Sequence, residues 1–282
     1  EGGGSIAFAP PGAGKSFLAL LKAMSLATGF THLWTVPAAR PVLFVNLERS
    51  AESLHWRDQQ VRRALSIPGR SEVKYLHGRG KTISGIKRHL YQWARQQQGQ
   101  GIVFVDSISR AAEGPLGEDQ TANELTNILN GIDGSWYAIG HTPRADKSHL
   151  FGSQLWDAGA DIEIKVSSER RENELGLRLE VVKANDLAYP PAQYLALVFD
   201  EDGLASVRVA KRSEFPELLS AETLSRLQKL VLYVQEVGLT TATDAAEATH
   251  IPRTDISAMF QNQPFVFVRR EGHKSLYGLL AT

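Results

Sequence analysis

Residues 9–16, which read Ala-Pro-Pro-Gly-Ala-Gly-Lys-Ser, form the group with the clearest chemical meaning. They follow the apolar run 6–8 and precede an apolar helical stretch at residues 17–21. A glycine-rich loop between a strand and a helix, closed by Lys-Ser, is typical of a phosphate-binding loop, although Ala9 replaces its first glycine. Glycines let backbone N–H groups turn toward phosphate oxygens, and the helix N-terminus attracts the anion.

The loop predicts how ATP and Mg²⁺ would be bound. Lys15 is expected to reach the β- and γ-phosphates, and the Ser16 hydroxyl is expected to bind Mg²⁺. Asp106 follows the apolar stretch 102–105, so its carboxylate should emerge at the ligand end of the sheet as the second magnesium ligand. The expected nucleotide-binding residues are Pro11, Gly12, Ala13, Gly14, Lys15, Ser16 and Phe17.

Hydrolysis also requires a residue that orients and deprotonates water. The position after Asp106 is Ser107, so the acidic residue that many ATPases carry there is missing. Glu48 is the alternative, because it ends the apolar stretch 42–47 at the same expected sheet edge and can reach the attacking water. The competing interpretation of Glu48 is a helix-capping or surface glutamate just before Ser50.

Composition narrows the class of protein. A chain of 282 residues with 43% hydrophobic residues fits one or two ordinary domains, and no apolar run approaches the length of about 18 residues that a membrane span needs. Cysteine is absent, which fits a reducing cytoplasm. With 31 basic and 31 acidic residues, any nucleic-acid surface must be local. The chain begins at Glu1 just before its first strand, so we expect a preceding segment.

Strand and helix signals alternate in the first half of the chain, and a run of strands follows. This order predicts an α/β fold with a mostly parallel sheet that antiparallel strands extend. Strands are expected at residues 42–47, 73–77, 101–106, 136–140, 160–166, 175–183 and 194–199, and helices at 50–66, 84–98 and 121–129.

A second, smaller domain is expected after residues 211–217, where the composition changes. The predicted boundaries are 1–212 for the first domain and 213–282 for the second. The second shows helical stretches at 220–237, 243–249 and 253–261, then apolar stretches at 265–268 and 275–279 joined by a basic turn. Three helices and a β-hairpin predict a winged helix-turn-helix, with Pro252 in the first turn of its third helix.

Several segments resemble hexameric replicative helicases. Residues 42–54, Val-Leu-Phe-Val-Asn-Leu-Glu-Arg-Ser-Ala-Glu-Ser-Leu, are similar to the stretch of DnaB-type enzymes that carries the catalytic glutamate. Val182-Lys183-Ala184-Asn185 is similar to a strand end in plasmid helicases of the RepA type. Gly-His-Thr-Pro-Arg at 140–144 resembles their sensor segment, and residues 152–161 resemble the strand region that follows. The resemblance covers residues 4–210.

This resemblance implies a RecA-like P-loop NTPase core that forms a homo-oligomer, a hexameric ring or a filament, with ATP between neighbours. Glu48 takes the place of the catalytic base, and His141 that of the γ-phosphate sensor; His141 can equally be a neutral histidine that satisfies a strand end. Lys183 would act in the adjacent subunit's site, and the competing interpretation is a surface salt-bridging lysine. DnaB-type enzymes carry an arginine two residues after that lysine, where this chain has Asn185. Arg144, Arg178 and Arg208 are unranked substitutes for it.

DNA contacts are expected in loops and in the second domain. In RecA-like folds the loops corresponding to residues 110–120 and 142–150 face the channel; the second carries Arg144 and Lys147, whereas the first is mainly acidic. Simple solvated loops are the alternative for both. The basic residues expected to contact DNA in the second domain are Arg253, Arg269, Arg270 and Lys274. Residues 214–282 carry six basic and eight acidic residues, so a protein-docking winged helix competes with a DNA-binding one.

The sequence thus favours an ATP-hydrolysing, DNA-associated motor, specifically a plasmid- or phage-type replicative helicase. The alternative is an ATP-gated DNA-binding or assembly protein, such as a recombinase-like, loader or regulatory ATPase, that does not unwind DNA.

Overall fold

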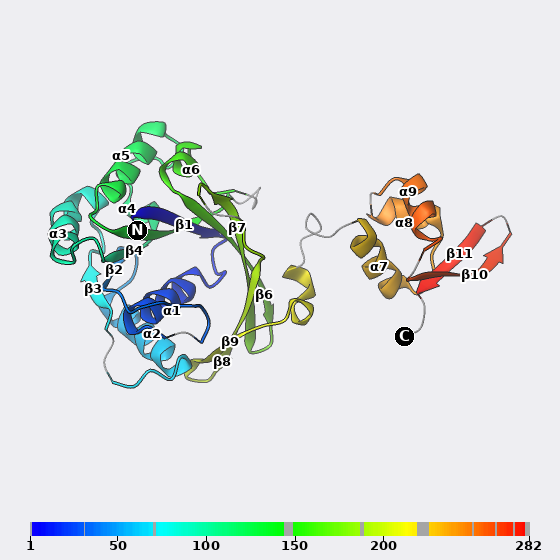
Figure 1. Cartoon of the computed structure of the whole chain (residues 1–282), viewed down its shortest axis with the longest axis horizontal. Coiled ribbons are helices and arrows are strands. Elements are labelled where there is room, and N and C mark those ends of the chain that lie inside the picture. Colours follow the sequence, from blue (N-terminus) through cyan, green and yellow to red (C-terminus); the bar gives the residue numbers. More distant parts are fainter. Residues whose placement is uncertain are drawn as a thin grey trace. The chain divides into compact units, whose positions relative to one another are not determined.

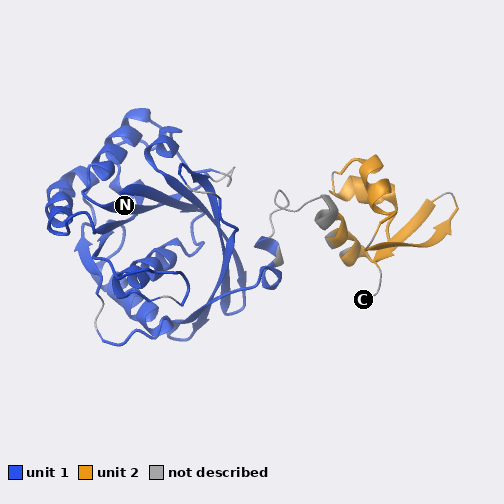
Figure 2. Ribbon diagram, viewed as in Figure 1, with its two compact units in different colours: residues 1–218 blue, residues 219–282 orange. Residues whose placement is uncertain are grey.

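The computed structural model describes residues 2–30, 32–69, 72–143, 149–186, 189–218, 226–249, 251–262, 264–272 and 274–279. It contains two compact units, residues 1–218 and 219–282, which Figure 2 shows in different colours. Among the described residues, no helix is both long enough and apolar enough to cross a membrane.

A single large sheet organises the first unit. Its strands are β1 (Gly3–Ala9), β2 (Val42–Asn46), β3 (Lys74–His77), β4 (Ile102–Asp106), β5 (Ser135–His141), β6 (Ile162–Arg171), β7 (Glu174–Ala184), β8 (Gln193–Asp200) and β9 (Gly203–Val209). They are ordered β3-β2-β4-β5-β1-β6-β7-β8-β9. The strands from β3 to β6 pair in parallel, and β7, β8 and β9 add antiparallel pairs. The predicted parallel sheet with an antiparallel extension is confirmed.

Helices cover both faces of this sheet (Figure 1). Helices α1 (Lys15–Thr28) and α2 (Ala51–Ala64) lie on the concave face, and α3 (Ile83–Gln96), α4 (Ile108–Ala111), α5 (Asp119–Asn130) and α6 (Leu155–Gly159) lie on the other. The central strands β2 and β4 are therefore buried on both sides, which explains their continuous apolar sequences. Phe44 and Phe104 face α1 and α2, whereas Val45 and Val105 face α3 and α5.

The element boundaries differ from the expected ones by a few residues. Ser50 is the N-cap of α2, and its hydroxyl accepts a hydrogen bond from the Ser53 N–H at 3.2 Å. The segment 110–120, expected to be a loop, contains the end of α4 and the start of α5. Strand β9 was not predicted; it lies at the sheet edge, where short alternating sequences give a weak signal.

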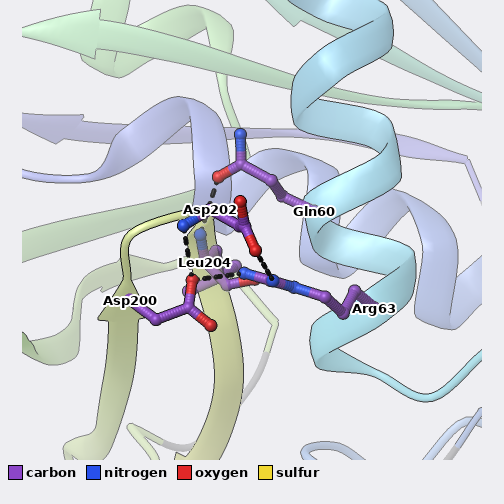
Figure 3. Close-up of polar contacts among 5 residues, drawn as sticks. All are labelled: Gln60, Arg63, Asp200, Asp202 and Leu204. Atoms are coloured by element: carbon purple, nitrogen blue, oxygen red, sulfur yellow. Dashed lines mark hydrogen bonds and ion pairs between the residues drawn. The ribbon is translucent and has the colours of Figure 1, made fainter.

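The β8–β9 hairpin is fastened to α2 (Figure 3). Gln60 Oε1 accepts a hydrogen bond from the Leu204 N–H at 2.7 Å, and Arg63 pairs with Asp200 at 2.8 Å. Arg63 also donates to the Leu204 carbonyl at 3.1 Å. These contacts close the antiparallel extension over the helices of the concave face. Two 3₁₀ turns, η1 (Arg212–Glu214) and η2 (Pro216–Leu218), follow β9, and η2 packs on β6 and β7 of the same sheet.

The second unit contains α7 (Arg226–Val237), α8 (Ala242–Thr249), α9 (Arg253–Met259) and the antiparallel hairpin β10 (Phe265–Glu271) and β11 (Lys274–Leu279). Leu230, Val234, Ile256 and Phe260 form its core with apolar residues of the hairpin. Thr240, between α7 and α8, forms an isolated antiparallel β-bridge with Tyr277 of β11. Pro252 is the N-cap of α9, not a residue of its first turn as expected, because its backbone ψ of 133° is not helical.

Candidate nucleotide-binding site

The loop between β1 and α1 has the backbone that a phosphate-binding loop requires. Gly12 and Gly14 have φ angles of 80° and 81°, a region that residues with a Cβ rarely adopt. A Cβ on Gly14 would also lie 2.9 Å from Leu175 Cδ2. Gly14 is the N-cap of α1, so the helix begins at Lys15 and its free N–H groups face the loop.

Lys15 is held inside the loop in this structure. Its Nζ donates to the carbonyl oxygens of Ala9 and Pro10 at 2.7 and 2.8 Å, and it lies 3.2 Å from His141 Nδ1. Burial lowers the pKa of Lys15 to about 8, against the opposing effect of the Asp106 and Glu48 charges. Burial, and then the Lys15 charge, lower the pKa of His141, so its Nδ1 can accept a hydrogen bond from the ammonium.

Ser16 and Asp106 are in contact at the carboxyl ends of β1 and β4. The Ser16 side chain hydrogen-bonds the Asp106 carboxyl group, which is only 4% exposed. Burial raises the pKa of Asp106 to about 6, and the Ser16 hydrogen bond partly opposes this. A hydroxyl and a buried carboxylate suit Mg²⁺, which commonly takes its remaining ligands from water and phosphate oxygens. A cluster of three or more His, Cys, Asp or Glu is not found within the described ranges, and this mode of binding does not require one.

A short turn after β2 presents Glu48. The Asn46 side chain closes it, because Oδ1 accepts from the Arg49 N–H at 2.9 Å and Nδ2 donates to the Arg49 carbonyl at 2.8 Å. Glu48 Oε2 accepts a hydrogen bond from the Ser107 hydroxyl at 3.1 Å. Ser50, not Glu48, caps α2. The Glu48 side chain lines the same cavity as Asp106.

These groups line one cavity of about 290 Å³. Of the expected nucleotide-binding residues, Pro11, Gly12, Gly14, Lys15, Ser16 and Phe17 line it, together with Glu48, Asp106 and His141. Ala13 does not; its side chain is buried on the far side of the loop, toward β6.

The cavity also contains residues that sequence reasoning missed. Arg57 comes from α2, and its guanidinium carbon lies 5.0 Å from the Phe17 ring centroid. Burial and the neighbouring Arg49 lower the pKa of Arg57, whereas Asp106 and Glu48 raise it. No sequence motif identifies Arg57 as a site residue. The one feature that could have pointed to it is its position on the predicted helix after Ser50, nine residues after Glu48.

Arg170 and Phe199 line the end of the cavity that contains aromatic rings. The Arg170 guanidinium carbon lies 5.8 Å from the Phe199 ring centroid, and Phe199 packs edge-to-face on Phe17 with centroids 5.7 Å apart. Arg170 lies at the end of β6 and Phe199 at the end of β8, where β6, β7 and β8 pair antiparallel. The cavity therefore joins a polar part, at the loop between β1 and α1, to an aromatic part.

Lys183 lies at the end of strand β7 that is farther from the loop between β1 and α1. In the antiparallel register Lys183 stands opposite Glu163, at the start of β6. Leu175, at the other end of β7, lies beside Gly14 of the loop. The Lys183 ammonium donates to the carbonyl oxygens of Ala160, at 2.6 Å, and Asp157. Lys183 therefore cannot act on the nucleotide of its own subunit.

The suggested arginine substitutes are engaged within the subunit or lie outside the described residues. Arg178 is buried and pairs with Glu180 at 2.6 Å. Arg208 pairs with Glu174 at 3.3 Å and with Glu214 at 2.7 Å. Arg144 and Lys147 lie outside the described residues.

The expected DNA-contacting residues of the second unit are on its surface. Arg253 begins α9, and Arg269, Arg270 and Lys274 lie on the hairpin; all four are exposed. Arg269 pairs with Glu271 at 2.7 Å.

Comparisons with known proteins agree with this description of the first unit. Residues 1–135 match the family described as "AAA domain". A search of curated proteins found no match. Among solved structures, a KaiC-like protein from the hyperthermophilic archaeon Pyrococcus horikoshii is similar at 15% identity and a TM-score of 0.50, over 75% of this chain and 90% of that chain. The chain therefore has a RecA-like P-loop fold, and at this identity the similarity concerns the fold alone.

Proposed function

We propose that this chain binds ATP with Mg²⁺, hydrolyses it, and works as a homo-oligomeric, DNA-associated motor of the replicative helicase type. One observation carries the ATPase part: Lys15, Ser16, Asp106, Glu48 and His141 line one cavity at the carboxyl ends of adjacent parallel strands. The sequence separates these residues by up to 126 positions, so their convergence is a property of the fold.

The phosphates of ATP fit the loop, where the N–H groups at the start of α1 and the Lys15 ammonium would bind them. Lys15 would exchange the Ala9 and Pro10 carbonyls for phosphate oxygens. Ser16 and Asp106 would hold Mg²⁺, which neutralises charge on the phosphates. Glu48 would orient and deprotonate the attacking water, with Ser107 fixing the carboxylate through its hydroxyl. His141 would respond to the γ-phosphate through its contact with Lys15.

Arg57 and the aromatic part of the cavity extend this proposal. The guanidinium of Arg57 faces Glu48 and Asp106, so its donors are suited to the γ-phosphate. We assign the aromatic part, with Phe199 and Arg170, to the nucleobase, which would stack on these flat groups.

The oligomeric part of the proposal rests on Lys183. A lysine at the strand end farther from the loop can serve a nucleotide only if another subunit brings its own loop there. A head-to-tail arrangement repeats this contact and generates a hexameric ring or a filament. Lys183 would then stabilise charge on the phosphoryl group of the neighbour's ATP.

DNA is the proposed partner of the oligomer. Three helices followed by a hairpin, with a bridging Thr240 before α8, are the order of a winged helix. Arg253 on its third helix and Arg269, Arg270 and Lys274 on its wing are proposed to contact phosphates, together with Arg144 and Lys147 of the first unit. Binding should weaken with added salt.

A second function is favoured by one departure from the helicase pattern. Asn185 stands where those enzymes have an arginine, and both described substitutes, Arg178 and Arg208, are tied in ion pairs of their own subunit. An ATP-gated DNA-binding or assembly protein can work with slower ATP hydrolysis than a helicase, so a site without an arginine from the neighbouring subunit fits that function. A strand-displacement assay with a forked DNA substrate separates the two: ATP-dependent unwinding supports the helicase, and ATP-dependent DNA binding without unwinding supports the alternative.

A further inference from the structure

Arg49 lines the nucleotide cavity directly after Glu48. The Asn46 side chain holds the main chain of Arg49 on both sides, because it accepts from the N–H at 2.9 Å and donates to the carbonyl oxygen at 2.8 Å. The Arg49 side chain itself is only half-buried. The turn after β2 therefore fixes the point from which this side chain borders the cavity.

Two guanidinium groups of the cavity lack an acidic partner. In the part of the chain that the structure describes, neither Arg49 nor Arg57 forms an ion pair, whereas Arg62 on the same helix as Arg57 pairs with Asp58 at 2.9 Å. Burial, and then the charge of Arg49, lower the pKa of Arg57, so the two guanidinium groups act on each other as like charges. An anion bound by both would relieve this repulsion.

The charged side chains described along the cavity wall have an excess of positive charge. The cations are Lys15, Arg49, Arg57 and Arg170, and the anions are Glu48 and Asp106. His141 adds no charge at neutral pH, because burial and then the Lys15 charge lower its pKa. A cleft with surplus cations attracts a polyanion. The complex of ATP with Mg²⁺ is doubly negative, which matches the two surplus cations.

The donors of Arg49 are also the least engaged. The guanidinium of Arg57 lies 5.0 Å from the Phe17 ring centroid, and that of Arg170 lies 5.8 Å from the Phe199 ring centroid. Over the described positions, the Arg49 side chain has no hydrogen bond, ion pair or ring contact. It therefore offers all the donors of its planar fork beside the proposed base.

We propose that Arg49 is a further catalytic residue, whose guanidinium binds the γ-phosphate of the ATP in its own subunit. The inference rests on the proposed function, which places the γ-phosphate beside Glu48. In that hydrolysis the water oxygen bonds to the γ-phosphorus, Glu48 takes the water proton, and ADP leaves with the electron pair of the broken P–O bond. Arg49 stabilises the charge that is spread over the oxygens of the transferred group.

A transition-state analogue tests this assignment. The complex of ADP, Mg²⁺ and aluminium fluoride imitates the transferred phosphoryl group. Arg49→Ala should lower turnover by roughly 10²–10³ and weaken binding of this complex by a similar factor, with little change in the affinity for ADP. Arg49→Lys, which keeps the charge but not the fork, should recover only part of the loss. Arg88→Ala, at an exposed position of α3, is the control.

Two results of this titration would overturn the role of Arg49. One is binding of the aluminium fluoride complex by Arg49→Ala as tightly as by the wild type. The other is a loss of ADP affinity as large as the loss of affinity for the complex, because the arginine would then bind the ground state equally well.

Mixed subunits test whether Arg49 acts within its own subunit. Arg49→Ala subunits keep an intact loop, and Lys15→Ala subunits keep Arg49. If both residues serve the same subunit's nucleotide, no site in the mixture is complete. The hydrolysis rate should then equal the weighted sum of the rates of the two variants alone. A rate above this sum would show action on a neighbour's nucleotide and overturn the placement.

The wild-type chain separates a failure of this inference from a failure of the proposed function. A wild type that neither hydrolyses ATP nor binds the aluminium fluoride complex would overturn both. A wild type that hydrolyses ATP, with the same turnover in Arg49→Ala, would overturn the role of Arg49 and leave the proposed function in place.

Discussion

The Lys15 ammonium lies 3.2 Å from Nδ1 of His141, so the lysine of the glycine-rich loop touches the residue at the end of the neighbouring strand β5. The same lysine binds two carbonyl oxygens of its own loop. If Lys15 binds phosphate as proposed, nucleotide binding redistributes these hydrogen bonds, and His141 is in contact with the lysine that changes partners. This relationship connects the phosphate site to the segment that follows β5.

Glu48→Gln should leave ATP affinity close to that of the wild type and lower the turnover rate by roughly 10²–10⁴, the effect of a positioned base. The amide keeps the size of the side chain and its contact with Ser107 but cannot take a proton from water. Equilibrium binding of a fluorescent ATP analogue and steady-state hydrolysis measure the two effects. Glu52→Gln, four residues later and exposed, is the control. Normal hydrolysis by Glu48→Gln would refute the assignment of the base.

Arg57→Ala should weaken ATP binding more than ADP binding. A charge-assisted hydrogen bond contributes about 1.5–3 kcal/mol, so the ratio of the two affinities should change by roughly tenfold or more. Calorimetric titration with each nucleotide measures the ratio. Arg62→Ala, on the same helix but paired with Asp58, is the matched control. An equal loss of ATP and ADP affinity in Arg57→Ala would place this arginine away from the γ-phosphate.

The residues that line the polar half of the cavity could be picked out from the sequence, because they sit at strand ends. Lys15, Asp106 and Glu48 each follow an apolar stretch, and parallel strands bring such ends to one edge. Arg57, Arg170 and Phe199 were missed because they reach the cavity only through the packing of α2 and the antiparallel extension. Nothing in the local pattern around Phe199 distinguishes it from an ordinary core phenylalanine.

Lys183→Ala subunits should be weak ATPases alone and Lys15→Ala subunits inactive, and a mixture of the two should recover part of the activity. In a head-to-tail oligomer, some interfaces of the mixture combine an intact loop with an intact Lys183. Hydrolysis rates across a series of mixing ratios show this recovery as a maximum at intermediate ratios. Lys87→Ala, an exposed lysine of α3, serves as the partner control. Strictly additive rates in the mixture would rule out action in trans.

Glu163 should make the stability of the protein fall as the pH rises. Burial, and then the Asp157 charge, raise the pKa of Glu163 from 4.5 to about 7. Between pH 4.5 and about pH 7, Glu163 therefore keeps its proton in the folded state but has lost it in the unfolded chain. The stabilisation is complete below about pH 4.5 and is lost as the pH rises toward 7, with a limiting slope of about 1.4 kcal/mol per pH unit.

The variant Glu163→Gln isolates this contribution, because an amide does not titrate. Urea unfolding at pH 5 and pH 8 measures the free energy of unfolding of both proteins. The variant should gain stability relative to the wild type on going from pH 5 to pH 8. A constant difference between the two proteins would show that Glu163 titrates normally.

The central claim, that the cavity at the carboxyl ends of β1, β2, β4 and β5 hydrolyses ATP, is tested most directly by phosphate release. The purified chain, Lys15→Ala and Asp106→Asn are compared at equal concentration with ATP, with and without Mg²⁺. We expect Mg²⁺-dependent turnover by the wild type and none above background by either variant, because one loses the phosphate cation and the other a metal ligand. Turnover by Lys15→Ala at the wild-type rate would contradict the account.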